Sequence, residues 1–138
     1  LSVVKYITDE IMVMYLGNVM EKGETDQIFD SPLHPYTKAL FSAVPVPDPN
    51  VKMNRIILEG DIPSPANPPK GCKFHTRCKE CMNACKFVEP KFIEHAPNHF
   101  VACHLYDMEI MNNLEKYDLE YEKMIQEENE LKENENKE

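Results

Sequence analysis

Residues 71–85 read GCKFHTRCKECMNAC and hold four of the five cysteines of the chain. The fifth is Cys103, so the successive cysteines are separated by five, two, three and seventeen residues. Thiolates are soft ligands that favour zinc, copper(I) and iron–sulfur clusters. Only one C-x-x-C pair is present, Cys78 to Cys81, so the spacing matches neither a zinc ribbon nor a ferredoxin. The spacing leaves open a zinc site, an iron–sulfur cluster or free buried thiols.

The histidines are weaker candidates for metal ligands. His34 precedes Pro35 and is expected to start a helix, because proline suits the first helical turn. His99 and His104 flank a predicted strand, where hydrogen bonding is the commoner role for histidine. His75 lies within the cysteine-rich stretch itself. A Cys/His nucleophilic pair has no accompanying oxyanion-hole or base-orienting motif, which disfavours a hydrolase.

Length and charge limit the class of protein. The 138 residues have room for one modest domain or for the end of a larger one. We find no run of about 18 apolar residues and no secretory signal, so we expect a cytosolic protein. The net charge is −9, and residues 106–138 contribute most of it, with twelve Asp/Glu against four Lys. The absence of a basic stripe argues against nucleic acid as a partner.

Apolar patterning in the first third predicts a hairpin followed by a helix. The run 11–15 is strand-like, and Gly17 allows a tight turn into a second strand that begins at Asn18 and ends at Gly23. A helix is expected to begin at Pro35 and to reach about Val44. Its packed stripe is predicted to consist of Tyr36, Leu40, Phe41 and Val44.

The remainder of the chain is less regular until its C-terminal end. Residues 45–71 contain most of the prolines, and only the run 55–58 could form a strand there. Near the C-terminus, apolar residues recur at steps of four and three, which predicts a helix with a narrow seam formed by Ile110, Leu114, Tyr117, Tyr121 and Met124. Residues 127–138 lack this seam and are expected to fray, because they offer little apolar area.

No stretch of the sequence predicts a nucleotide site. The phosphate loop G-x-x-x-x-G-K-[S/T] is missing, and the four glycines, at positions 17, 23, 60 and 71, are too scattered to form a glycine-rich cradle. We therefore expect the chain to bind no triphosphate unaided.

Several stretches together resemble the ATP-binding subunits of oligopeptide, dipeptide and nickel ABC transporters. Residues 1–4 resemble the segment after the switch histidine of these ATPases, and residues 11–17 resemble the strand and turn that follow. The run IFDSPLHPYTKAL, residues 28–40, resembles the HPYT segment that marks the family. Residues 58–65, 71–78 and 99–104 resemble the C-terminal extension of this family.

The resemblance implies an α+β chain in three parts. Residues 1–44 would end the ABC ATPase α/β domain, residues 45–105 would form a proline- and cysteine-rich extension, and residues 106–138 would form an acidic helical tail. It also implies a four-iron four-sulfur cluster, for which zinc is the alternative metal, and it leaves Cys81 as a spare thiol or an alternative ligand. The ligands that it implies are Cys72, Cys78, Cys85 and Cys103.

The resemblance also implies what the chain serves. The phosphate loop, signature motif, catalytic glutamate and switch histidine would precede residue 1, so the chain should not hydrolyse ATP alone, and ATP–Mg would bind only in the complete subunit. That subunit would pair with a second ATP-binding subunit beneath the membrane permease subunits, on the cytoplasmic face of the cell membrane, and would drive peptide import. The alternative is a stand-alone zinc-binding interaction module.

Overall fold

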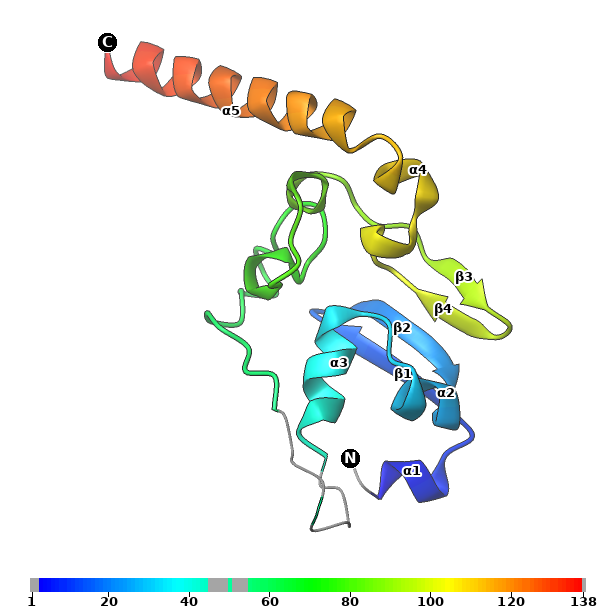
Figure 1. The fold of residues 1–138 in the computed structure, drawn as a ribbon. Helices are drawn as coiled ribbons and strands as arrows, with labels where there is room; N and C mark the ends of the chain where they lie inside the picture. Colours follow the sequence, from blue (N-terminus) through cyan, green and yellow to red (C-terminus); the bar gives the residue numbers. More distant parts are fainter. Residues whose placement is uncertain (1–2, 45–49, 51–54, 138) are drawn as a thin grey trace.

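The computed structural model describes residues 3–44, 50 and 55–137. They form a mixed α+β structure in which a four-stranded antiparallel sheet, ordered β1-β2-β4-β3, lies below a region of loops and short helices (Figure 1). The predicted hairpin is confirmed as β1 (Glu10–Tyr15) and β2 (Asn18–Glu24). Leu16 and Gly17 close it, with φ of 48° and 80°. Positive φ at both central positions matches the right-handed twist of the strands.

Three short helices surround this hairpin: α1 (Val4–Ile7), α2 (Thr25–Asp30) and α3 (Pro35–Ser42). Pro35 occupies the first turn of α3, as predicted, but the helix ends two residues before the expected Val44. The fully buried residues of α3 are Thr37 and Ala39, whereas the predicted stripe of Tyr36, Leu40, Phe41 and Val44 is half-buried.

The sheet joins segments that are far apart in the sequence. β3 (Ile93–Ala96) and β4 (His99–Val101) form a second hairpin, and β4 pairs with β2 through Glu21 opposite Val101 and Lys22 opposite Phe100. The first hairpin and the extension predicted from residue 45 onward therefore share one sheet.

The run 55–58 does not form the predicted strand. The backbone N–H of Ile56 donates to the Ser42 Oγ at 2.9 Å, and Leu58 packs against the main core cluster. The segment thus lies along the end of α3. The cysteine-rich stretch that follows contains two single-turn 3-10 helices, η1 (His75–Arg77) and η2 (Asn83–Lys86).

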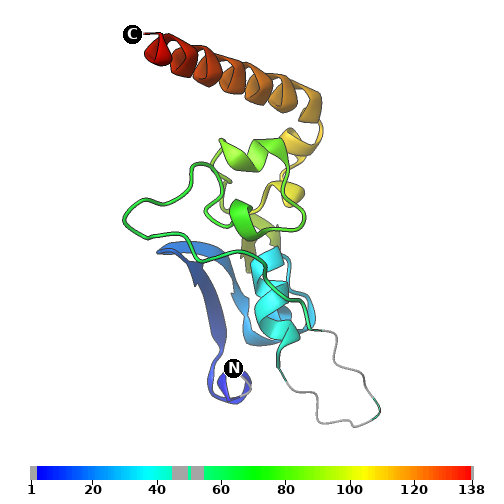
Figure 2. The ribbon, with the colours of Figure 1, turned by 90° about the vertical axis from the view of Figure 1, so that its left-hand side faces the viewer.

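The chain ends in helices, with η3 (His104–Tyr106) and α4 (Met108–Met111) leading into α5 (Leu114–Asn136). Figure 2 shows α5 extending away from the body. The expectation that residues 127–138 fray is wrong through Asn136, because Glu, Lys and Leu are strong helix formers even without a buried face. Seam residues Tyr117 and Tyr121 lie 6.3 and 6.2 Å from the Phe87 ring.

The main core lies where the first hairpin meets the cysteine-rich stretch. Its fully buried members are Tyr15, Met20, Cys72 and Phe74. None of the helices in the described part of the chain combines the length and the apolar character that crossing a bilayer requires.

Candidate metal centre

The structure brings the four predicted ligand cysteines together around one small cavity. Three of them come from the loop that contains η1 and η2, and the fourth directly follows β4. All five cysteines of the chain are free thiols. The residues that line the cavity are His34, Pro35, Cys72, Phe74, His75, Cys78, Glu80, Cys85, Cys103, His104 and Leu105.

The backbone of the loop sets this convergence. The N–H of Cys72 donates to the carbonyl of Cys85 at 2.8 Å, which closes the loop on itself. Gly71, at φ 69°, makes this approach possible: a Cβ there would lie 2.7 Å from the Phe87 nitrogen and closer still to the Cys85 carbonyl oxygen. Only glycine combines this conformation with so close a backbone contact.

Phe74 fixes the loop to the rest of the molecule. Its side chain is 1% exposed and lies among three rings of the first hairpin and of the N-terminal end of α3. The ring centroids are 5.3 Å from Tyr15, 5.2 Å from Tyr36 and 5.7 Å from His34. Tilted and edge-on aromatic contacts at these distances add to the free energy of burial. The cavity is thus held against α3 by a packed aromatic cluster.

Burial keeps these thiols protonated. Burial, which is the largest cause, and the neighbouring thiols together raise the pKa of Cys72 and of Cys78 to about 11 and that of Cys103 to about 12, although a backbone hydrogen bond lowers each pKa somewhat. Burial also raises the pKa of Cys85. A metal ion reverses this effect, because a coordinating thiol is deprotonated outright.

Cys81 differs from the other four cysteines. It does not line the cavity, and its thiol donates to the Met82 carbonyl at 3.5 Å. Burial raises its pKa, and Cys85 raises it further. Cys81 nevertheless lies beside the cavity, because its thiol interacts with that of Cys85.

Cysteine thiols are suitable ligands for a metal ion, but these four are not arranged around one common position. Among the described residues, no three Cys, His, Asp or Glu side chains are grouped so that they could hold one metal ion. The cavity measures about 10 Å³, roughly the space of one water molecule. The cavity is lined by four cysteine thiols and by two buried histidine rings. Each of these rings has one nitrogen without a hydrogen-bond partner among the described residues.

The two buried imidazoles are those of His34 and His104. His34 begins α3, as predicted, and its Nδ1 accepts the N–H of Tyr36 at 3.0 Å. Burial, and then the charge of Lys38, lower the pKa of His34 to about 4. His104 hydrogen-bonds through Nε2 to the Val88 carbonyl at 2.7 Å, which matches its predicted role. In the described part of the chain, His34 Nε2 and His104 Nδ1 have no partner.

His75 and His99 also make hydrogen bonds. His75 Nδ1 lies 2.8 Å from the Cys72 carbonyl oxygen. His99 pairs with the fully buried carboxylate of Glu21, which also accepts the backbone N–H groups of Leu33 at 3.1 Å and His34 at 2.8 Å. Sequence analysis missed Glu21, because no local pattern marks a carboxylate that is buried by contacts twelve and seventy-eight residues away.

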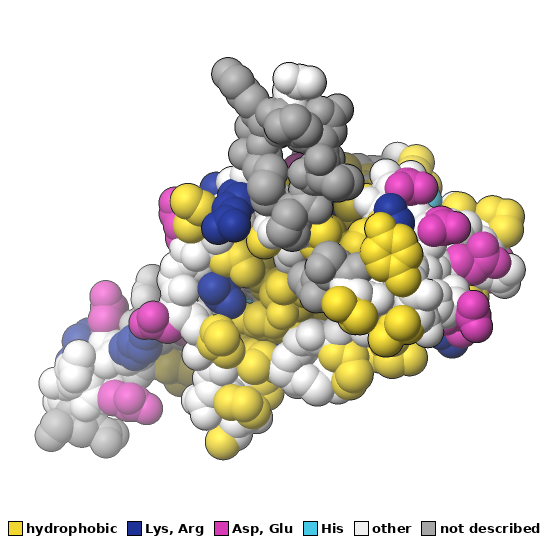
Figure 3. Space-filling view, turned by 90° about the horizontal axis from the view of Figure 1, so that it is seen from below, with side chains coloured by type: hydrophobic (Ala, Val, Ile, Leu, Met, Phe, Trp, Pro, Cys, Tyr) yellow, Lys and Arg dark blue, Asp and Glu magenta, His cyan; other side chains and the backbone are white. Residues whose placement is uncertain are grey.

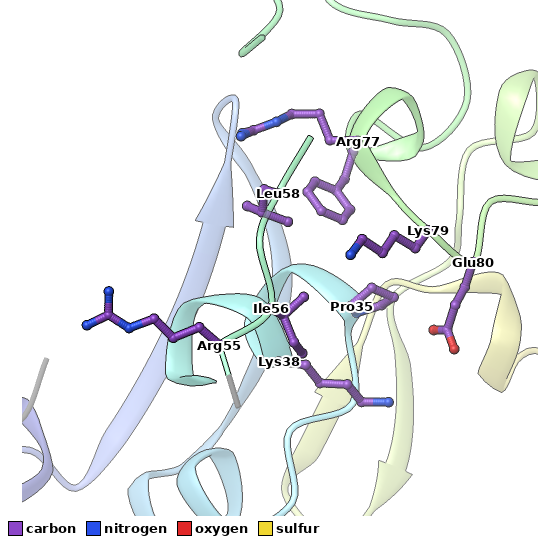
Figure 4. Close-up of a pocket in the computed structure, with 9 residues that line it drawn as sticks. Pro35, Lys38, Arg55, Ile56, Leu58, Arg77, Lys79 and Glu80 are labelled. Atoms are coloured by element: carbon purple, nitrogen blue, oxygen red, sulfur yellow. The ribbon is translucent and has the colours of Figure 1, made fainter. Parts of the chain in front are cut away.

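A larger and more open pocket of about 340 Å³ lies beside this cavity (Figure 4). Pro35, Phe74 and Glu80 line both spaces. The open pocket has an apolar floor formed by Ile56 and Leu58, and it carries four cationic side chains against the one carboxylate of Glu80. These cations are Lys38, Arg55, Arg77 and Lys79. No cysteine lines this pocket, so it is chemically distinct from the metal centre.

Comparison with known proteins adds to this geometry. A family model described as "Oligopeptide/dipeptide transporter, C-terminal region" matches residues 20–85. The match includes the HPYT segment and three of the four converging cysteines, and it stops before Cys103.

Two curated proteins are similar to most of the chain. The oligopeptide transport ATP-binding protein AppF of Bacillus subtilis (strain 168) is 57% identical over 108 residues, which are 77% of this chain and 33% of that protein. The dipeptide transport ATP-binding protein DppF of Haemophilus influenzae is 52% identical over 103 residues, which are 75% of this chain and 32% of that protein. The chain thus spans about a third of the length of these relatives.

Proposed function

The chain corresponds to the C-terminal region of oligopeptide/dipeptide transport ATP-binding proteins, and we propose that it completes such a subunit in a peptide importer. In this role it supplies the end of the ATPase domain and an extension that braces the assembled subunit. ATP–Mg binds to the remaining part of the subunit, because residues 1–138 contain no phosphate loop.

Exposed apolar side chains support a role in assembly. In α1 and beside it, Val3, Tyr6 and Ile7 are 65%, 83% and 73% exposed, and on β1 both Met12 and Met14 are 51% exposed. Figure 3 shows hydrophobic side chains gathered on the face seen from below, the side on which α1 lies. Large apolar patches mark interaction sites. We assign these side chains to contacts with the rest of the ATP-binding subunit.

The second part of the proposal is that the extension carries a four-iron four-sulfur cluster on Cys72, Cys78, Cys85 and Cys103. One observation carries it: four thiols from two separate segments line one buried cavity, while the fifth does not. A bound cluster supplies a rigid link between these segments, and metal affinity adds directly to folding stability. Phe74 holds the loop in place, and Gly71 lets the backbone close.

Partners and location follow from the same proposal. The complete subunit pairs with a second ATP-binding subunit and docks on membrane permease subunits at the cytoplasmic face of the cell membrane. It makes no contact with nucleic acid, since the chain carries a net charge of −9. The acidic α5 projects from the body and has no assigned partner in this scheme.

A second candidate is a stand-alone zinc-binding interaction module. The size of the cavity favours it, because about 10 Å³ suits one ion better than a cluster of eight atoms. Zinc needs thiolates at about 2.3 Å, which the cysteine side chains reach by closing inward instead of opening outward.

The DNA upstream of the Leu1 codon tests the transporter proposal. We expect an open reading frame that encodes the phosphate loop, signature motif, catalytic glutamate and a final His-Asp pair, either fused to this chain or as a neighbouring gene. If neither is present, the chain acts without an ATPase and the interaction module is favoured. The metal content of the purified chain then distinguishes zinc from iron and sulfide.

A further inference from the structure

Cys81 is the cysteine that the proposed function leaves without a role, and its side chain lies against another cysteine. The carbonyl oxygen of Met82 accepts the Cys81 thiol at 3.5 Å and the backbone N–H of Cys85 at 3.0 Å. The Cys81 side chain is therefore folded back over the first residues of η2. There the thiols of Cys81 and Cys85 interact with each other.

Exposure limits which cysteines a small reagent can reach. Cys72 and Cys103 are buried, whereas Cys78, Cys81 and Cys85 are half-buried. All five are free thiols. The candidates for a reaction at the surface of the protein are therefore the three cysteines in the middle of the loop.

The sequence and the structure favour different pairs among these three. Cys78 and Cys81 form the C-x-x-C of the chain, a spacing typical of thiol–disulfide redox pairs. In the structure, however, Cys78 directly follows η1 and lines the cavity, which Cys81 does not. A disulfide requires two Cβ atoms within about 3.5–4.5 Å of each other, so thiols that already interact close with the least movement of the backbone. That pair is Cys81 and Cys85.

We propose that Cys81 and Cys85 are a site of reversible disulfide formation by a low-molecular-weight disulfide such as oxidised glutathione. A thiolate of the pair attacks one sulfur of the oxidant, which forms a mixed disulfide with the protein and releases one glutathione thiolate. The second cysteine then attacks the protein sulfur of this mixed disulfide and releases the second glutathione. Two protein thiols are oxidised, one external disulfide is reduced, and the two thiol protons pass to the glutathione thiolates.

This modification requires neither the transporter role nor a bound metal. It depends only on two half-buried thiols that interact with each other. Oxidation would withdraw Cys85 from the four thiols that line the cavity, so the disulfide and a metal held by all four would exclude each other. In a reducing compartment such disulfides are usually transient, which agrees with a reversible modification.

Mass spectrometry of the 138-residue chain tests the pairing. The chain is reduced in the presence of a chelator, transferred to oxidised glutathione, alkylated with iodoacetamide and digested with trypsin, which cleaves after lysine and arginine. Residues 80–86, ECMNACK, lie between two such sites, so one tryptic peptide contains both thiols. We expect this peptide to be unalkylated and two hydrogens lighter than its reduced form. A Cys78–Cys81 bond would instead link it to residues 78–79, and would overturn the inference.

Two serine variants serve as a matched pair. We expect Cys78→Ser to form the internal disulfide as readily as the unmodified chain. Cys85→Ser should instead accumulate the mixed disulfide of Cys81 with glutathione, because the second thiol is missing. The reverse result, in which Cys78→Ser is trapped as the mixed disulfide and Cys85→Ser forms an internal disulfide, would assign the reaction to the C-x-x-C pair and contradict the proposal.

The same reaction in urea shows whether the folded structure selects the pair. Without folded contacts the cysteines pair according to loop length, so the shorter Cys78–Cys81 loop competes with the Cys81–Cys85 loop. We expect the Cys81–Cys85 product to predominate in buffer, where circular dichroism verifies the fold, and to lose this predominance in urea. The same mixture of disulfides under both conditions would contradict the inference.

Discussion

The cysteine-rich loop of residues 71–87 and helix α5 differ both in the regularity of the backbone and in the burial of their side chains. The loop contains only two single-turn 3-10 helices, yet it buries Cys72, Phe74 and Ala84. α5 is regular over 23 residues and buries none of them. In these two regions, regular secondary structure and tertiary packing are therefore separated. We expect stability and metal chemistry to reside in the irregular loop, because packing contributes more to stability than helix propensity does.

Truncation of one large apolar side chain in each region should show the largest difference. Phe74→Ala removes a buried ring from the aromatic cluster and should lower the free energy of unfolding by about 3–5 kcal/mol. Leu119→Ala, at a position on α5 that is 58% exposed, should change it by less than about 0.5 kcal/mol. Urea unfolding followed by circular dichroism measures both. Similar losses in the two variants would mean that α5 is packed in solution.

The backbone of the loop provides a second test, in which Gly71→Ala is compared with Gly17→Ala. Both glycines have positive φ, so each alanine costs about 1–2 kcal/mol from conformation alone. Only at position 71 does the new Cβ also meet backbone atoms, whereas at position 17 nothing lies within 4 Å. We expect Gly71→Ala to be more destabilising by at least about 1 kcal/mol, as measured by urea unfolding. Equal costs would contradict the close approach of Cys72 and Cys85.

The thiols offer a pH test on metal-free protein. Alkylation requires the thiolate, and burial raises the pKa of Cys78 from 9.0 to about 11. At pH 8 its alkylation should therefore be about a hundredfold slower than that of an exposed thiol, and its rate should keep rising up to about pH 11. Because the folded-state pKa is the higher one, its contribution to stability is lost as pH rises from 9 through 11. Mass spectrometry of a Leu119→Cys variant compares both thiols in one molecule, and equal rates would show that Cys78 is exposed.

Removal of residues 127–138 should have the smallest effect. Residues 127–137, the part of this segment that the structure describes, are all exposed, so the free energy of unfolding should change by less than about 0.5 kcal/mol. The helical signal in circular dichroism should fall in proportion to the residues lost. A large loss of stability would reveal a contact between this segment and the body.

Local sequence patterns correctly predicted the turns and helix starts that depend on a few neighbouring residues. Gly17 marked the hairpin turn and Pro35 the start of α3, and both are confirmed because turn and helix-start geometry depend on a few neighbouring residues. The run 55–58 looked like a strand but follows the end of α3 instead. Helix α5 extends beyond its apolar seam, because propensity alone sustains it.

The candidate site was predictable in its thiols but not in its surroundings. Cysteine spacing and family resemblance together indicated the four positions that converge, although neither identified the metal. The pairing of β2 with β4 and the buried Glu21–His99 pair join residues about eighty positions apart, which a single sequence does not reveal. The HPYT pattern predicts that His34 starts α3, but it cannot show which ring nitrogen caps the helix.

Iron and sulfide analysis of anaerobically purified chain, together with five Cys→Ser variants, tests the central claim most directly. We predict a brown protein with broad absorbance near about 400 nm and about four irons and four sulfides per chain. The cluster should be retained in Cys81→Ser and lost or strongly reduced in the variants at positions 72, 78, 85 and 103. A colourless chain containing one zinc, or a cluster that depends on Cys81 as much as on the other four, would contradict it.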